Sequence, residues 1–157
     1  MATTTAKRRR SRRGEGDKLK EEILEVAEKL LVEAGNEDAV SIRAIADAVG
    51  CTPPAIYLHF DDKDALFFAV CAQRFEEFDR FVHAEGDVTL DPLESLRTRG
   101  KSYIRFGLEH PEHYKLLMMM PKTKMAAELG PDAPGMPAFT HLVEAVQRCI
   151  DAGVISE

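Results

Sequence analysis

Apolar residues recur at helical spacing along most of this chain. In the segment from about Asp17 to Ala34, an apolar side chain returns every three or four residues, at Leu19, Ile23, Val26, Ala27, Leu30 and Leu31. Gly35 then stands where such a helix would stop. No convincing strand pattern and no internal repeat accompany this spacing. The pattern therefore predicts an all-α protein.

A short helix is predicted directly after Ser41. A serine is a favourable N-cap, because its hydroxyl can accept a hydrogen bond from a backbone N–H group of the first turn. Four apolar residues follow at the spacing of a single stripe: Ile42, Ile45, Ala46 and Val49. Gly50 comes next, where a residue that tolerates positive φ is needed to end the helix.

A second short helix is predicted from Pro53 to about His59 or Phe60. Thr52 precedes it as an N-cap, and the proline occupies the first helical position, where its missing N–H costs nothing. Ile56 and Phe60 share a face at i and i+4 and are expected to be buried. The outward-facing residues are then Thr52, Pro54, Tyr57 and His59.

Four further helices complete the layout. They are expected at about Asp62–Glu85 (after a cap by Asp61 or Asp62), after Asp91–Pro92 and up to Pro111, at about Glu112–Met119, and at about Pro137–Ala152. The first of the four has Leu66, Phe67, Val70, Phe75, Phe78 and Phe81 or Val82 as its apolar contacts. The next is expected to use Leu93, Leu96, Gly100, Ile104 and Leu108. The last is expected to turn Phe139, Leu142, Val143, Val146 and Ile150 inward, and residues 122–137 are predicted to form a loop rich in proline and glycine.

Two short helices around a tight turn, followed at once by a longer helix, form the pattern of a helix-turn-helix. Such a motif places its second helix in the major groove of duplex DNA. The pattern therefore predicts a sequence-specific DNA-binding protein. A helical hairpin within another kind of bundle remains the alternative.

The residues of this motif resemble those of the TetR family of bacterial transcription regulators. The resemblance is carried by the run from Gly50 to Phe60 and by Lys63-Asp64-Ala65-Leu66, with Ser41-Ile42-Arg43 upstream. It is specific over about residues 18–66 and weaker beyond, where residues 103–114 look like the ligand domain of one TetR branch. Cys51 replaces a usual aliphatic residue, and Pro54 adds a second proline to the helix that meets the bases.

The resemblance implies a TetR-like architecture in three parts. Residues 1–16 would be a disordered basic arm, residues 17–66 a helix-turn-helix DNA-binding domain, and residues 67–157 a helical effector-binding and regulatory domain. The family normally continues with two further helices that pair across a two-fold axis, so the last domain is expected to be incomplete. The implied protein is a ligand-responsive repressor that binds a palindromic operator as a homodimer. A truncated or constitutive DNA-binding protein without effector control is the alternative.

DNA-contacting residues follow from this layout. Thr52, Pro54 and Ala55 would lie nearest the base edges, where the proline and alanine offer only apolar contact. Arg43 is the best candidate for a contact to guanine or to a phosphate, and the hydroxyls of Ser41 and Thr52 are candidate phosphate donors. By resemblance, the phosphate-binding positions are Tyr57, His59 and Lys63.

Charge is distributed unevenly. Residues 1–14 carry six basic side chains, including Arg8, Arg9 and Arg10, and no acid, so the other 143 residues must total −12 to give the net charge of −6. A cationic arm on an acidic body is suited to attracting DNA phosphates or entering the minor groove. A tail with only nonspecific affinity is an equally weighted alternative.

The regulatory half contains aromatic and methionine side chains suited to a small apolar or aromatic effector. The candidate ligand-binding residues are Phe78, Tyr103, Phe106, Tyr114, Leu117, Met118 and Phe139, each of which could equally be an ordinary core residue. His110 and His113 raise a metal-responsive alternative, but Pro111 lies between them and no ligand set completes a site. We therefore predict no metal and no cofactor.

An enzyme is not predicted, because no nucleophile–base pair, glycine-rich phosphate loop or paired-carboxylate motif stands out. Three cysteines, at 51, 71 and 149, have no metal-like spacing and are expected to be buried or half-buried thiols, with redox sensing by Cys51 as a minor alternative. No apolar run is long enough to span a membrane, and no secretory signal is recognisable. These features predict a cytoplasmic, nucleoid-associated protein.

Overall fold

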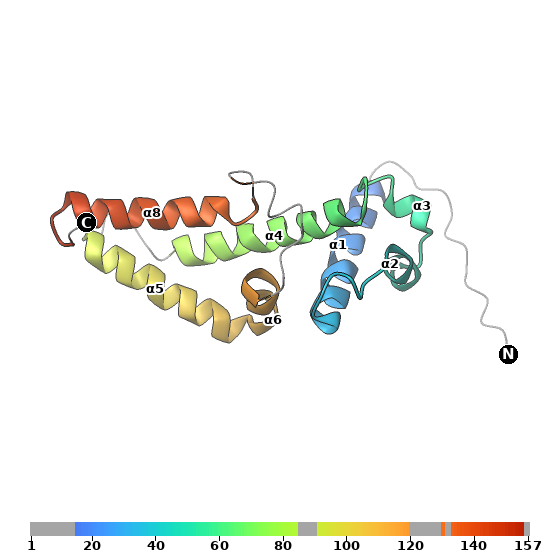
Figure 1. Ribbon diagram of the computed structural model, residues 1–157, viewed down its shortest axis with the longest axis horizontal. Helices are drawn as coiled ribbons and strands as arrows, with labels where there is room; N and C mark the ends of the chain where they lie inside the picture. Colours follow the sequence, from blue (N-terminus) through green and yellow to red (C-terminus); the bar gives the residue numbers. More distant parts are fainter. Residues whose placement is uncertain (1–14, 85–90, 120–129, 131–132, 156–157) are drawn as a thin grey trace. The chain divides into compact units, whose positions relative to one another are not determined.

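The computed structural model describes residues 15–84, 91–119, 130 and 133–155. All regular structure in these residues is helical, as predicted (Figure 1). The elements are α1 (Glu15–Ala34), α2 (Ile42–Val49), α3 (Pro53–Ile56), α4 (Lys63–Ala84), α5 (Pro92–Glu109), α6 (Pro111–Tyr114), the π-helical segment η1 (Lys115–Met119) and α8 (Met136–Asp151). The basic arm and most of the predicted loop at 122–137 lie outside the described residues.

The chain divides into two compact units, at Val70 and Cys71. The N-terminal unit comprises α1, α2, α3 and the first turns of α4. Its core contains the apolar stripes predicted for these helices, with Ile23, Ala27, Leu31, Ile45, Ala46, Ile56, Phe60, Leu66 and Phe67 all buried. Burial of these side chains holds the short helices in place, since helices of eight and four residues would not be stable alone.

The C-terminal unit contains the rest of α4 together with α5, α6, η1 and α8. The aromatic side chains Phe75, Phe78 and Phe106 form its core with Leu117. Polar contacts also join its helices. His141 of α8 lies 2.9 Å from Asp79 of α4, and Arg148 of α8 donates to Ser95 of α5 over 3.2 Å.

The buried face of α5 differs from the predicted one. Ser95, Arg99, Ser102 and Phe106 are buried, whereas the side chains expected to be inward include Ile104 and Leu108, which are 64% and 77% exposed. The prediction assumed that the most apolar stripe is the buried one. Hydrogen bonding instead allows Arg99 and Ser95 to lie inside, because each has a polar partner on a neighbouring helix.

The same correction applies to α8. Ala145 and Cys149 form its buried face, while three of the residues predicted to point inward are about half exposed, at Phe139, Leu142 and Val143. The inward-facing residues have small side chains, and the larger apolar residues lie on the outer face. The periodicity of the sequence could not distinguish the two faces. None of the helices described, across either unit, combines the length and apolarity that a membrane crossing requires.

Candidate nucleic-acid interface

Helix α2 begins and ends as the sequence predicts. The hydroxyl oxygen of Ser41 accepts a hydrogen bond from the backbone N–H of Ala44 over 3.1 Å. At the other end Gly50 adopts φ 77°, and its N–H donates to the carbonyl oxygen of Ala46. These two caps fix the length of α2 and therefore the position of the turn that leads to α3.

Helix α3 is shorter than predicted. Regular α-helix ends at Ile56, and a turn carries the chain through His59, whose N–H donates to the Ile56 carbonyl oxygen. The two prolines at the start of α3 do not account for this, because the N–H groups of the first helical positions have no partner within the helix. Thr52 occupies the N-cap position but makes no side-chain capping bond, so its predicted capping hydrogen bond is absent; its backbone oxygen instead accepts from Ala55.

The surface presented by α3 and its turn is mixed in chemistry. Thr52 and Pro54 are exposed and Ala55 is half-buried, while Tyr57 is 51% exposed. Leu58 is 83% exposed and is not among the residues predicted to contact DNA. Its exposure could have been predicted, because it lies two residues from both Ile56 and Phe60, and a residue midway between two inward-facing residues points outward.

His59 is only half-buried and lies next to the start of α1. An added Cβ on Gly16 would be 3.9 Å from the His59 ring. The ring also lies 6.5 Å from that of Phe60, centroid to centroid. This imidazole therefore packs within the unit while keeping a solvent-facing side, which leaves its predicted role as a phosphate contact a prediction.

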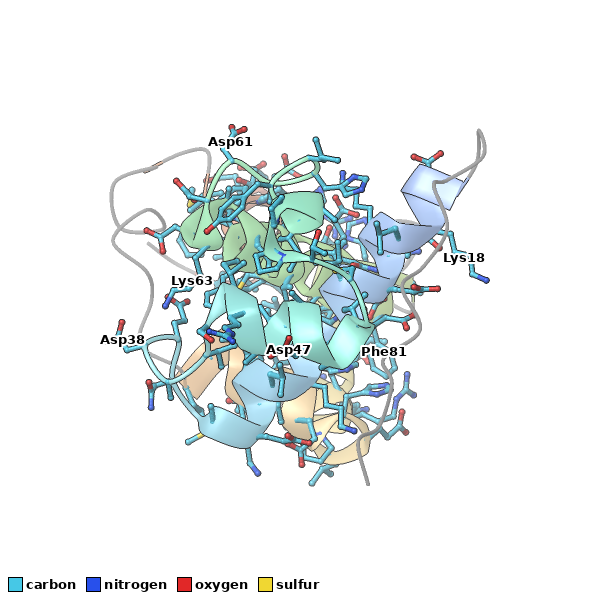
Figure 2. The ribbon with its side chains drawn as sticks, turned by 90° about the vertical axis from the view of Figure 1, so that its right-hand side faces the viewer. Lys18, Asp38, Asp47, Asp61, Lys63 and Phe81 are labelled. Atoms are coloured by element: carbon cyan, nitrogen blue, oxygen red, sulfur yellow. The ribbon has the colours of Figure 1, made fainter. Side chains whose placement is uncertain are left out.

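Lys63 has a structural role that the sequence did not indicate. Its ammonium donates to the carbonyl oxygens of Glu37, over 3.0 Å, and Val40, over 3.3 Å, in the loop between α1 and α2. It also lies 5.6 Å from the centroid of the Phe67 ring. Figure 2 shows Lys63 beside the loop that carries Asp38. Two of its three N–H donors are thus committed to holding this loop.

Acidic side chains surround the same loop and the start of α4. Asp62 caps α4, as one of the two alternatives predicted, because its carboxylate accepts from the Ala65 N–H over 2.7 Å. Burial raises the pKa of the Glu37 carboxyl, and the negative charge of Asp64 raises it further. The exposed Asp47 on α2 and Asp61 before α4 also project from this unit (Figure 2). These carboxylates would repel DNA phosphates and so reduce the electrostatic attraction that a nearby basic residue such as Lys63 can supply.

Arg43 is exposed on the first turn of α2, directly after Ser41. Ser41 is also exposed, but its oxygen is already engaged as a cap. The three arginines predicted to contact DNA from the arm, Arg8, Arg9 and Arg10, lie outside the described residues. Among the described residues, the predicted DNA contacts that are exposed and not engaged as a cap are therefore Arg43 and those in α3 and its turn.

Most of the predicted effector-binding residues come together in the core of the C-terminal unit. Phe78, Phe106 and Leu117 are buried in it, with Tyr114 and Met118 packed against them. Tyr103 is 38% exposed, and its hydroxyl lies 3.1 Å from that of Tyr114. This hydrogen bond, together with burial, raises the pKa of Tyr103. Phe139 does not join the cluster and is 57% exposed.

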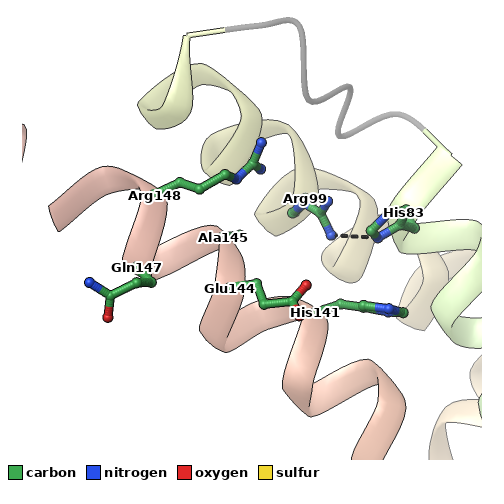
Figure 3. A pocket seen from close by; sticks show the side chains of 7 residues that line it. All are labelled: His83, Arg99, His141, Glu144, Ala145, Gln147 and Arg148. Atoms are coloured by element: carbon green, nitrogen blue, oxygen red, sulfur yellow. Dashed lines mark hydrogen bonds between the residues drawn. The ribbon is translucent and has the colours of Figure 1, made fainter. Parts of the chain in front are cut away.

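A cavity of about 460 Å³ lies elsewhere in the same unit, between the C-terminal end of α4 and the facing parts of α5 and α8 (Figure 3). Six of the seven residues that line it have polar or charged side chains: His83, Arg99, His141, Glu144, Gln147 and Arg148, together with Ala145. None of these residues was predicted from the sequence. They come from three helices and form no motif in the sequence. The only local signal was the i and i+4 spacing of Asp79 and His83, which places two polar side chains on the same face of α4.

The first part of the chain matches a known family. The family model described as bacterial regulatory proteins, tetR family, matches residues 23–70, which contain α2, α3 and the start of α4. Residues 23–70 therefore form a helix-turn-helix DNA-binding segment of the TetR family. The family and the fold are those of transcription regulators rather than enzymes.

A curated relative supports the same assignment. Over 65 residues the chain is 37% identical to the HTH-type transcriptional repressor Rv1474c of Mycobacterium tuberculosis. The matched segment covers 41% of this chain and 34% of that protein. The likeness thus spans about a third of the length of the relative.

Solved structures resemble the chain over a greater length. A TetR family transcription regulator from Marinobacter aquaeolei has a TM-score of 0.71 and 23% identity, over 90% of this chain and 73% of its own. A TetR family regulator from a Shewanella species has a TM-score of 0.75 and 20% identity, over 88% and 73% respectively. These similarities establish the all-α TetR fold beyond the DNA-binding unit.

Proposed function

We propose that this protein is a ligand-responsive repressor that binds a palindromic operator as a homodimer. The observation that carries the proposal is the helix-turn-helix itself, with α2 fixed by both caps and a turn that leaves Thr52, Pro54 and Tyr57 exposed. Repression is the activity named for the mycobacterial relative. Such a protein would act in the cytoplasm, where the chromosome is.

In this proposal α3 enters the major groove. Pro54, Ala55 and the exposed Leu58 offer apolar contact, for instance to thymine methyl groups, while Thr52 and Tyr57 offer hydroxyl donors. The flexible side chain of Arg43 supplies the charged contact, to a guanine edge or to a phosphate. Hydrogen-bonded readout by α3 is consequently sparse, and much of the specificity rests on Arg43.

Phosphate contacts are assigned to Tyr57, His59, Lys63 and the hydroxyls of Ser41 and Thr52. For Lys63, the third N–H is the donor that remains for a phosphate after the two bonds to the loop. Arg8, Arg9 and Arg10 of the basic arm add electrostatic attraction that falls as salt rises.

The C-terminal unit is proposed to bind a small effector that shifts the population between DNA-binding and released states. Such a shift requires the effector to bind one state more tightly than the other. The aromatic cluster around Phe78 and Phe106, with Tyr103, Tyr114, Leu117 and Met118, supplies an apolar wall for an effector of apolar or aromatic character. Phe139, on the exposed face of α8, belongs to this wall only if that helix moves.

The experiment that tests the proposal is selection of binding sites from random duplex DNA by the purified chain at near-physiological salt. Enrichment of an inverted repeat, with half-sites about 34–36 Å apart or a multiple of that distance, supports a dimeric regulator. Enrichment of a single half-site supports the DNA-binding unit and contradicts dimeric recognition. Binding without enrichment, lost as salt rises, contradicts specific regulation and leaves only the basic arm as the source of affinity.

A further inference from the structure

The cavity between α4, α5 and α8 has a basic character. Two guanidinium groups face it, those of Arg99 on α5 and Arg148 on α8, against the single carboxylate of Glu144 (Figure 3). Arg99 is only 5% exposed, which makes it a charge held inside the unit. The volume of about 460 Å³ lies within the range of small-molecule sites, roughly 300–1,000 Å³.

The two arginines oppose each other electrostatically. Burial lowers the pKa of the Arg99 guanidinium, and the positive charge of Arg148 lowers it further. Asp79 and Glu144 act in the opposite direction but less strongly than burial and Arg148. An anion placed in the cavity would relieve this repulsion and form charge-assisted hydrogen bonds with both groups.

The hydrogen bond between Arg99 and His83 determines which ring nitrogen of His83 can donate a hydrogen bond. Nη1 of Arg99 lies 2.8 Å from Nδ1 of His83. A guanidinium can only donate, so Nδ1 must accept, and the ring of neutral His83 carries its proton on Nε2. Burial and the charge of Arg99 both lower the pKa of His83, which is consistent with this neutral form. His83 therefore offers an N–H donor rather than an electron pair.

The protonation of His83 on Nε2 argues against a metal ion bound by His83. Atoms of Asp79, His83 and His141 that could bind a metal ion lie within 4.8 Å of one another. This is the only such group of three among the described residues. Coordination through Nδ1 is blocked because Arg99 donates to it, and coordination through Nε2 would move the ring proton to Nδ1, where it would face the N–H of Arg99. Histidines that bind metals usually donate their second N–H to a carboxylate or carbonyl, whereas this one faces a cation.

One buried face of α5 carries both a residue of the cavity, Arg99, and a residue of the aromatic cluster, Phe106. Ser95, Arg99, Ser102 and Phe106 are buried at i, i+4, i+7 and i+11, so they lie on one helix face. Seven residues separate Arg99 from Phe106, a rise of about 10 Å along the axis. A molecule with a charged group and an apolar body would match this face of α5, which has Arg99 at one point and Phe106 about 10 Å further along.

We infer that the cavity binds the carboxylate group of a small organic acid, with Arg99 and Arg148 as the charged donors and the N–H of His83 as a neutral one. The inference rests on the proposed function, because it names the chemical class of the effector. The apolar part of the acid is directed along α5 towards Phe106.

The test measures the thermal unfolding midpoint of the full chain with hexanoate and with benzoate, without DNA. Each carboxylate is compared with its matched neutral amide, hexanamide or benzamide, and with sodium chloride at equal ionic strength. At concentrations about tenfold above the dissociation constant, at least one carboxylate should raise the midpoint by roughly 3–6 °C. The matched amide and the salt should produce no such rise.

Three arginine variants locate the site. R148Q and R99Q should each abolish the rise, whereas R97Q should retain it, because Arg97 lies on α5 but is exposed and paired with Glu94. Should R99Q fail to fold, as judged by circular dichroism, R148Q decides the question, since Arg148 is only half-buried.

Several outcomes would overturn the inference. One is the absence of any carboxylate-specific rise, and another is an equal rise in R148Q and in the unmodified chain. A third is a rise with zinc chloride alone that is lost in His141→Ala, which would make the cluster a metal site. DNA-site selection is scored separately, so carboxylate binding without operator selection would sink the proposed function and leave this site standing.

Discussion

The ammonium of Lys63, at the first residue of α4, donates a 3.0 Å hydrogen bond to the carbonyl oxygen of Glu37, in the loop after α1. The bond spans 26 residues of sequence and connects the two longest helices of the N-terminal unit through their ends. A basic residue at this position therefore supports the arrangement from which α2 and α3 present their exposed residues. A substitution at Lys63 is therefore expected to change stability and, through the placement of α2 and α3, DNA affinity.

Lys63→Ala is expected to lower the free energy of unfolding by about 1–3 kcal/mol, because hydrogen bonds from a charged donor to two partly buried carbonyl oxygens are lost. Urea unfolding followed by circular dichroism measures this change. The matched control is Lys29→Ala, whose side chain is 76% exposed and 4.0 Å from Glu33. If Lys63 also contacts a phosphate, the slope of log K against log salt falls by about one unit. A stability equal to that of the control would contradict the structural role.

The two predicted N-caps should respond differently to removal of their hydroxyls. Ser41→Ala is expected to cost about 1 kcal/mol, because Ser41 caps α2 through its side chain. Thr52→Ala is expected to cost less than about 0.5 kcal/mol, because Thr52 makes no capping bond and is exposed. Urea midpoints of both variants measure the difference. Equal losses in the two variants would show that Thr52 has a stabilising contact in solution.

Arg43→Ala separates base recognition from phosphate binding. A contact to a guanine edge predicts that discrimination at one base pair falls by about 1–3 kcal/mol, with little change at other positions. A phosphate contact predicts uniform weakening for every sequence. Affinities for the selected site and for single-base variants measure the pattern at fixed salt. The exposed position of Arg43 on α2 predicts unchanged stability in either case, so a lowered unfolding midpoint would indicate another role.

The DNA-binding unit was predictable from sequence because local signals and burial agree there. Ser41 and Gly50 mark the two ends of α2, and Ile56 and Phe60 are buried as their spacing requires. Lys63 was the exception. Its hydrogen bonds reach 23 and 26 residues back along the chain, and no helical periodicity reports a contact of that length.

The C-terminal unit was predictable in its helices but not in their faces. On α5 the apolar stripe that contains Ile104 and Leu108 is exposed, and the face of Arg99 and Phe106 is buried. Periodicity identifies a stripe, yet a polar stripe can be buried where its members bond to neighbouring helices. The cavity was missed for the same reason, since its arginines and histidines meet only in three dimensions.

Stability should depend on pH through His83. Burial lowers its pKa below the ordinary value, and so do the charges of Arg99, His141 and Arg148, while Asp79 acts to raise it. The unfolded chain then binds a proton more readily than the folded one. The contribution of His83 is therefore present above pH 6.5 and lost as pH falls through the lowered folded pKa. Unfolding midpoints between pH 7.5 and 5 should fall less in His83→Gln than in the unmodified chain, and identical profiles would contradict this.

Phe106 and Phe139 were grouped as effector-binding candidates, but the structure separates them. Phe106 is 2% exposed in the aromatic core, so Phe106→Ala is expected to cost about 3–5 kcal/mol of stability. Phe139 is 57% exposed on α8, so Phe139→Ala should change stability by less than about 0.5 kcal/mol. Urea unfolding of the two variants compares a core residue with a surface residue of the same type. A large loss in Phe139→Ala would mean that its ring is covered in solution, and the outer face of α8 would then count as buried.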